Sequence, residues 1–121
     1  MPSSKHILVY AENPAVRRTK QLVLESAGYS VIAVGSMREV EYVASRTIFD
    51  LVILGRTVDA ELKKLAAQVV KQKLPNSPIL EMCDLKQCVD NPDYVLHTAN
   101  PEDLMAMVNS IFGVKEKRPN P

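Results

Sequence analysis

The sequence predicts an α/β domain built around a doubly wound parallel β-sheet. Short apolar runs alternate with longer segments in which apolar residues recur at helical spacing. The apolar runs are continuous rather than alternating with polar residues, which is typical of strands buried on both faces. Strands that alternate with helices form parallel βαβ units, and right-handed crossovers then place helices on both faces of the sheet.

The first half of the chain is expected to supply three strands and two helices. The strands cover residues 7–10, 29–34 and 51–54. Asn13-Pro14 begins the first helix, because Asn caps a helix and Pro fits its first turn. Gly28 ends that helix. Ser36 and Glu39 have the spacing of a capping box and begin the second helix.

The second half is expected to supply two strands and two further helices. The strands cover residues 78–82 and 94–96. Asp59 begins the third helix and Pro75 ends it, since proline cannot continue a helix. Asn100-Pro101 repeats the start of the first helix. The last helix ends at Gly113.

Length and composition are those of one ordinary soluble domain. The apolar fraction is 46% and the charged fraction 24%, so a packed core is expected over residues 1–113. Residues 114–121 are charged and proline-bearing, and we expect them to form a disordered tail. A net charge of +1 gives no reason to expect nucleic acid or a membrane as partner. Two cysteines without an apolar leader favour a cytoplasmic location.

Four segments carry a resemblance to a known family. They are residues 7–14, 49–54, 77–80 and 93–96. Together with Arg17-Arg18 and residues 24–29, their order and spacing resemble the receiver domain of bacterial two-component response regulators over nearly the whole chain. The resemblance implies a flavodoxin-like, CheY-like three-layer sandwich whose five parallel strands have the order 2-1-3-4-5.

The residues that follow the strands depart from the family pattern. A working receiver has an acidic pair after strand 1, an aspartate after strand 3, a Ser or Thr after strand 4 and a Lys after strand 5. The aspartate is the nucleophile on a phosphoryl group, and the carboxylates hold Mg²⁺. This chain has Ala11 and Glu12, Gly55, Cys83 and His97 at those positions. Gly55 cannot accept a phosphoryl group and Glu12 alone is a poor Mg²⁺ site, so we expect no catalytic residue, no metal and no cofactor.

The segment between the fourth and fifth strands is short. Residues 84–96 separate Cys83 from His97. The family has a whole helix in this stretch, and here it is about two helical turns too short. Asn91-Pro92 also disfavours a helix. The family's fourth helix is therefore expected to be shortened or absent, and the partner surface to differ.

These features predict a non-phosphorylatable receiver domain that acts in bacterial signal transduction through protein–protein interaction. The resemblance implies a histidine kinase, another response regulator or an output protein as partner. The oligomeric state stays open.

Two other functions remain as alternatives. The first is a small-ligand sensor that uses the vacated pocket at the carboxyl ends of the strands. The second is a thiol enzyme in which Cys83 and His97 form a dyad and Glu12 orients the imidazole. Asp50 is a poor substitute acceptor, because it begins the third strand at the opposite end and is expected to be solvated.

Two further groups are interpreted as structural. Cys83 and Cys88 are expected to be unrelated thiols, because their spacing is not that of a redox pair. A basic turn of the first helix is expected to be a solvated face, with a docking patch for an acidic partner as the alternative. This turn contains Arg17, Arg18 and Lys20.

Overall fold

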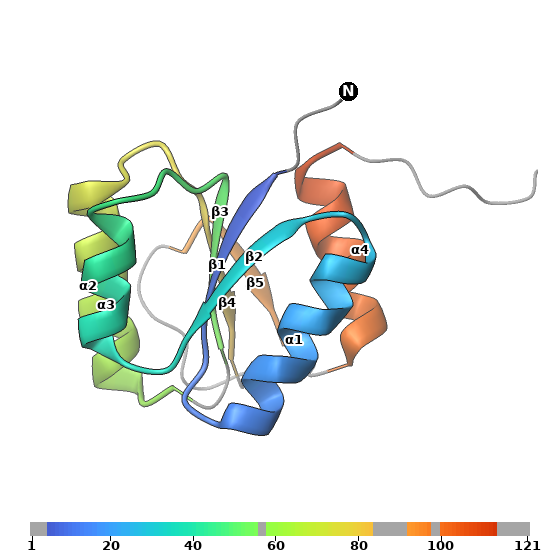
Figure 1. Ribbon diagram of the computed structural model, residues 1–121, viewed down its shortest axis with the longest axis horizontal. Coiled ribbons are helices and arrows are strands. Elements are labelled where there is room, and N and C mark those ends of the chain that lie inside the picture. Colours follow the sequence, from blue (N-terminus) through green and yellow to red (C-terminus); the bar gives the residue numbers. More distant parts are fainter. Residues whose placement is uncertain (1–4, 56–57, 84–91, 98–99, 114–121) are drawn as a thin grey trace, which may run out of the picture.

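The computed structural model describes residues 5–55, 58–83, 92–97 and 100–113. Five parallel strands form one sheet in the order β2-β1-β3-β4-β5 (Figure 1). The strands are β1 (His6–Tyr10), β2 (Ser30–Val34), β3 (Leu51–Leu54), β4 (Ile79–Met82) and β5 (Tyr94–Leu96). The helices are α1 (Pro14–Ser26), α2 (Met37–Ala44), α3 (Ala60–Lys73) and α4 (Pro101–Ile111). The predicted fold class and strand order are confirmed.

The helices cover both faces of the sheet, α2 and α3 on one and α1 and α4 on the other (Figure 1). Leu8 and Val52 contribute to the core under α2 and α3, whereas Ile7 and Leu51 contribute to the core under α1 and α4. Successive side chains of a strand point to opposite faces. The apolar runs are therefore continuous because both faces are buried.

The helices begin where their capping residues predict. The Asn13 side chain accepts hydrogen bonds from the amides of Ala15 and Val16, at 2.9 and 3.1 Å. Asp59 and Asn100 cap α3 and α4 in the same way.

Helix α2 has a variant of the capping box. Ser36 Oγ accepts from the Glu39 amide at 3.2 Å, and the Glu39 carboxylate accepts in return from the Gly35 amide at 3.1 Å. In the usual box the returning bond comes from the amide of the capping residue itself. Here it comes from the residue before it.

Helices α1 and α4 end at glycines with left-handed backbone. The φ angles are +94° at Gly28 and +71° at Gly113. A side chain at such an angle is strained, which explains why glycine occupies the position just after each helix.

Two predictions fall outside the described residues. The described part contains four helices, which agrees with a shortened family helix, but residues 84–91 themselves lie outside it, as does the expected tail at residues 114–121.

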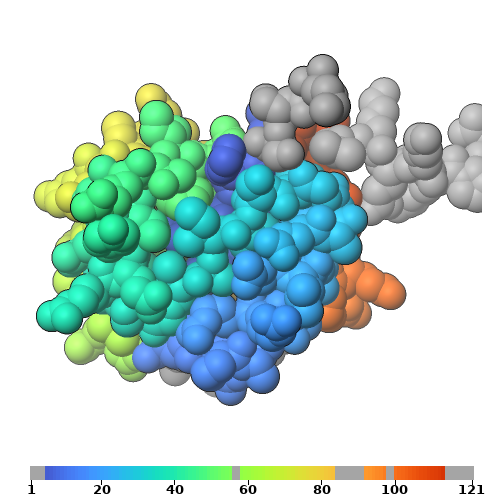
Figure 2. All heavy atoms as spheres, viewed as in Figure 1, coloured from blue at the N-terminus to red at the C-terminus, as the bar shows by residue number. Residues whose placement is uncertain are grey.

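No helix in the described ranges combines the length and apolar character needed to cross a membrane. The space-filling view shows α1 forming much of the molecular surface beside β2 (Figure 2).

Candidate functional site

The predicted site residues lie at one edge of the sheet, where the strands end. They are Ala11, Glu12, Gly55, Cys83 and His97. The Gly55 amide donates to the carbonyl oxygen of Tyr10 at 2.7 Å, which joins the ends of β3 and β1. The Cys83 amide donates to the carbonyl oxygen of Leu96 at 3.1 Å, which joins the ends of β4 and β5. The parallel topology therefore brings these positions to a common edge, as the sequence predicts.

Gly55, the position of the phosphoryl acceptor in the family, has no room for a side chain. A Cβ atom there would lie 2.8 Å from the carbonyl oxygen of Tyr10 and 3.1 Å from the Cβ of Ala11. Both Gly55 and Ala11 are buried. A contact of 2.8 Å with backbone is closer than packed atoms tolerate, so a side chain at this position requires the end of β1 to move.

Glu12 keeps the only carboxylate among the five positions, and that carboxylate serves the backbone. Its Oε1 atom accepts from the Asp59 amide at 3.1 Å, which links the end of β1 to the start of α3. The negative charge of Glu12 also adds to the effect of burial in raising the pKa of Tyr10. Within the described ranges, no group of three or more His, Cys, Asp or Glu side chains is placed to hold a metal ion.

Arg17 fixes the backbone that follows β1. Its Nη1 atom donates to the carbonyl oxygens of Ala11 and Glu12, at 3.0 and 3.4 Å. The same guanidinium packs against Gly35, where a Cβ atom would overlap it. Sequence reasoning missed this role, because a basic residue on a helix is solvated by default. The nearby Gly35 was the available signal, since glycine often marks a close approach.

Lys20 corrects the prediction of a solvated basic turn. Arg18 is exposed, but the Lys20 side chain is only 7% exposed. Lys20 lies four residues from both Val16 and Leu24, on the apolar face of α1. The helical spacing could have revealed its burial.

Cys83 and His97 meet, as neighbouring strand ends should. The distance from Cys83 Sγ to His97 Nδ1 is 3.9 Å, and from His97 Nδ1 to the Cys83 carbonyl oxygen 3.2 Å. Cys83 is disulfide-bonded, so its interpretation as an unlinked thiol is wrong. Cys88, the chain's only other cysteine, lies outside the described residues. A bonded sulfur cannot act as a nucleophilic thiolate, and the Glu12 carboxylate binds the Asp59 amide.

Asp50 lies at the start of β3, at the edge opposite the predicted site. Its Oδ2 atom accepts from the His6 amide at 2.8 Å, and its own amide donates to the His6 carbonyl oxygen at 2.7 Å. It therefore secures the first residues of β1 and is not solvated on all sides. It does not reach the predicted site.

A buried ion pair stands beside the predicted site and was not anticipated from the sequence. Lys63 Nζ lies 3.5 Å from Glu81 Oε2, and the two side chains are 4% and 0% exposed. The same nitrogen donates to the Met82 carbonyl oxygen at 2.8 Å. The sequence signal was a carboxylate inside the apolar run of β4, because a buried charge requires a partner.

Comparisons with solved structures identify the fold. The response regulator TrrA from Thermotoga maritima, solved with Mg²⁺ and BeF, superposes with a TM-score of 0.74 at 21% identity, covering 88% of this chain and 98% of that chain. A receiver protein from Sinorhizobium medicae has a TM-score of 0.74 at 19% identity, covering 96% and 100%. A response regulator from Burkholderia pseudomallei with a phosphorylated aspartic acid has a TM-score of 0.72 at 22% identity.

The match to the Burkholderia protein covers 85% of this chain but only 65% of that one. No protein-family model and no curated protein matches this sequence. At these identities the superpositions establish three-dimensional architecture alone. The chain has the CheY-like fold of response-regulator receiver domains.

Proposed function

We propose that this protein is a non-phosphorylatable receiver domain that acts in bacterial signal transduction through protein–protein interaction. The main support for this proposal is the glycine at position 55, where the family has its phosphoryl acceptor. It has no nucleophilic group, and the Tyr10 carbonyl oxygen would lie 2.8 Å from any Cβ atom built there. The loss of the acceptor therefore extends to the packing around it.

The surroundings of Gly55 support the same proposal. Phosphoryl transfer to a carboxylate needs Mg²⁺ to neutralise developing charge, and Mg²⁺ requires several oxygen ligands. Ala11 offers no carboxylate, and the Glu12 carboxylate accepts from the Asp59 amide. Arg17 also places a guanidinium on the Ala11 and Glu12 carbonyl oxygens, a positive group that disfavours a second cation nearby.

The proposed partner is a protein of the same signalling system: a histidine kinase, another response regulator or an output protein. The CheY-like fold supports this class of partner, because similar folds occur in the receiver domain of the hybrid histidine kinase CckA and at the N-terminus of a three-domain response regulator from Carboxydothermus hydrogenoformans. No enzymatic activity is proposed.

We also propose a cytoplasmic location, which conflicts with the bonded state of Cys83. Disulfides are rare in reducing compartments. Alkylation of thiols in freshly lysed cells distinguishes the two states. If Cys83 reacts without added reductant, the protein resides in a reducing compartment, whereas protection until reductant is added argues for an oxidising one.

The vacated edge is a weak candidate for a small-ligand site or a thiol enzyme. Ala11, Gly55 and Cys83 are all buried there, and the place of a Cβ atom at Gly55 is already crowded by the Tyr10 carbonyl oxygen. Cys83 is bonded rather than available as a thiolate.

The decisive experiment exposes the purified protein to acetyl phosphate and to phosphoramidate with Mg²⁺, beside a phosphorylatable receiver as positive control. Intact-mass spectrometry should show no stable gain of one phosphoryl group. A gain that maps to any Asp or Glu would overturn the proposal. Isothermal calorimetry should likewise detect no tight, stoichiometric Mg²⁺ binding.

A further inference from the structure

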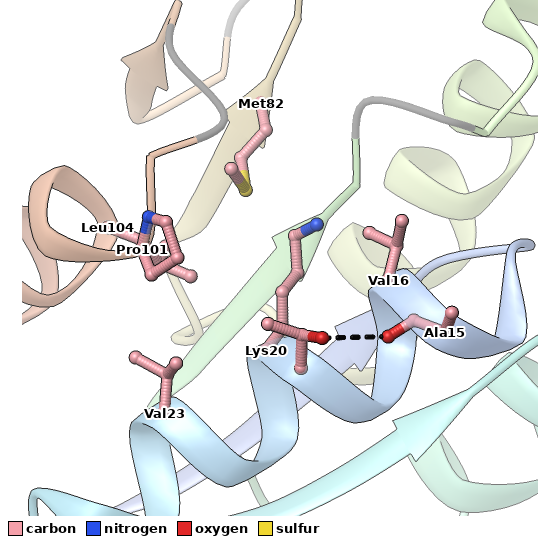
Figure 3. Close-up of a pocket in the computed structure, with 8 residues that line it drawn as sticks. Ala15, Val16, Lys20, Val23, Met82, Pro101 and Leu104 are labelled. Atoms are coloured by element: carbon pink, nitrogen blue, oxygen red, sulfur yellow. Dashed lines mark hydrogen bonds between the residues drawn. The ribbon is translucent and has the colours of Figure 1, made fainter.

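A cavity of about 240 Å³ lies between α1 and α4 (Figure 3). Helix α1 lines it with Val16, Lys20 and Val23. The end of β4 contributes Met82, and α4 contributes Pro101 and Leu104. A second, more open hollow of about 400 Å³ shares Val23 and Pro101 and extends along α4 to Met105. The two hollows adjoin at these shared residues, and together they are called the groove below.

The walls of this groove are almost entirely apolar. Valine, leucine, proline and methionine side chains face it from both helices and from β4. The hydroxyl of Thr19 is used locally, because it donates to the Ala15 carbonyl oxygen at 2.9 Å (dashed line in Figure 3). Ligand sites combine such apolar walls with one or a few placed polar groups.

The placed polar group is Lys20. It is 7% exposed, and its nitrogen lies on the Met82 side of the cavity, while its methylene stem forms part of the wall (Figure 3). Lys20 already has an interaction within the protein. An ammonium has three N–H donors, so a ligand carboxylate can bind beside that interaction.

The other charge along the groove limits the ligand. Glu102 lines the outer hollow and is exposed, so a second negative group on the ligand would be repelled there. A phosphate or polycarboxylate also needs more donors than one ammonium in an apolar cavity supplies. The groove fits a ligand with a single negative end and an apolar body.

We propose that the groove between α1 and α4 binds a small aliphatic monocarboxylate. Its carboxylate accepts a hydrogen bond from Lys20 Nζ, and its chain lies against Val23, Leu104 and Met105. Because the ligand would contact α1, β4 and α4 together, it would stabilise the packing of these three elements. The proposal goes beyond the proposed function, since it requires neither the loss nor the presence of phosphorylation.

The test uses the full chain and three probes with the same alkyl chain: octanoate, octanol and octylamine. Thermal shift should report stabilisation by octanoate, and amide chemical-shift changes in a ¹⁵N-labelled sample should cluster on α1, Met82 and the first turns of α4. Octanol should bind at least about tenfold more weakly, since it loses the charge-assisted hydrogen bond. Octylamine should bind more weakly still, because its ammonium would face that of Lys20.

Lys20→Met isolates the charge, because methionine keeps an apolar stem of similar length. This variant should lose at least about tenfold in octanoate affinity and leave octanol binding unchanged. Lys64→Met, at an exposed lysine of α3 on the other face of the sheet, is the matched control and should bind octanoate like the parent. Val23→Phe should weaken both octanoate and octanol by filling the groove.

Three results would each overturn the proposal: no saturable octanoate binding, equal affinities for octanoate and octanol, or unchanged octanoate affinity in Lys20→Met. Chemical-shift changes centred on α2 or α3 would also overturn it, because they would indicate non-specific adsorption of the alkyl chain. The three probes alone decide the question if Lys20→Met does not fold, since the comparison of octanoate with octanol uses the unaltered protein.

Discussion

At the scale of single residues, the size and charge of the side chains at the strand ends decide how closely the strands approach one another. Gly55 and Ala11 let the ends of β3 and β1 approach until a Cβ at position 55 would lie 2.8 Å from the Tyr10 carbonyl oxygen. Lys63 and Glu81 pair next to this edge with almost no exposure. Small residues bring the ends of β1 and β3 together at the family's acceptor position, and a buried ion pair lies on the neighbouring strand.

Gly55→Asp should destabilise the protein by about 1–3 kcal/mol, because the added Cβ overpacks the junction of β1 and β3. Gly55→Ala is the matched control and should lose a similar amount, since the Cβ atom alone causes the clash. Urea denaturation measures both. A variant Gly55→Asp as stable as the parent would show that β1 yields easily.

The Gly55→Asp variant should also fail to switch. A ligand shifts an equilibrium only through differential contacts with two states. Cys83 offers no hydroxyl, and His97 is shorter than a lysine, so the contacts to a phosphoryl group are missing. Amide spectra of β4 and β5 should stay unchanged on addition of beryllofluoride and Mg²⁺. Large shifts in those strands would mean that only the acceptor had been lost.

Lys63→Met should destabilise the protein by about 3–5 kcal/mol, because it removes the ammonium that lies 3.5 Å from the buried Glu81 carboxylate. The double variant Lys63→Met with Glu81→Leu should recover most of this loss, since buried ion pairs are often replaceable by apolar pairs. A double-mutant cycle by chemical denaturation gives the coupling between the two residues. Additive effects of the two single substitutions would argue that the pair does not act as a unit.

At the scale of helices and strands, capping residues decide where each helix begins. Asn13, Ser36, Asp59 and Asn100 each accept a hydrogen bond from an amide of the first turn. These amides have no partner within their own helix, so a side-chain acceptor compensates for them. Because the cap of α1 lies only three residues after the end of β1, it helps to set the path of the chain across the edge of the sheet.

Asn13→Ala should cost about 1 kcal/mol of stability, the usual effect of removing a helix cap. Asn13→Asp should keep most of the stability, because the carboxylate accepts the same amide hydrogen bonds and lies favourably at a helix N-terminus. The midpoint of urea denaturation at constant slope measures both. Equal losses in the two variants would point to a role of the amide nitrogen instead of the cap.

At the scale of the whole molecule, the layer made by α1 and α4 is tied to the sheet through Tyr29. Its hydroxyl donates to Asn109 Oδ1 of α4 at 2.5 Å, and its ring lies 5.4 Å from that of Phe112. Burial raises the pKa of the Tyr29 hydroxyl above its ordinary value of 10.0. The last helix thus depends on a phenol that must stay protonated.

Stability should therefore fall at alkaline pH. A raised pKa in the folded state means that the unfolded chain releases its proton first, so the contribution of Tyr29 is complete below pH 10.0 and is lost as pH rises through its folded pKa. Tyr10 has a raised pKa for the same main reason and should add to the loss. Tyr29→Phe should flatten the alkaline limb of a plot of unfolding free energy against pH, and an unchanged slope would exclude Tyr29 as a cause.

The sequence by itself was enough to predict the five strands and the starts of the four described helices. These features depend on neighbouring residues: an apolar run, or a capping residue at the start of a helix. The tertiary structure alone decided that Gly55 has no space for a side chain, that Arg17 holds the carbonyl oxygens after β1, and that Lys63 is the residue that pairs with Glu81. Each of these properties depends on which segments distant in the chain lie side by side. Short-range sequence patterns do not show which segments become neighbours.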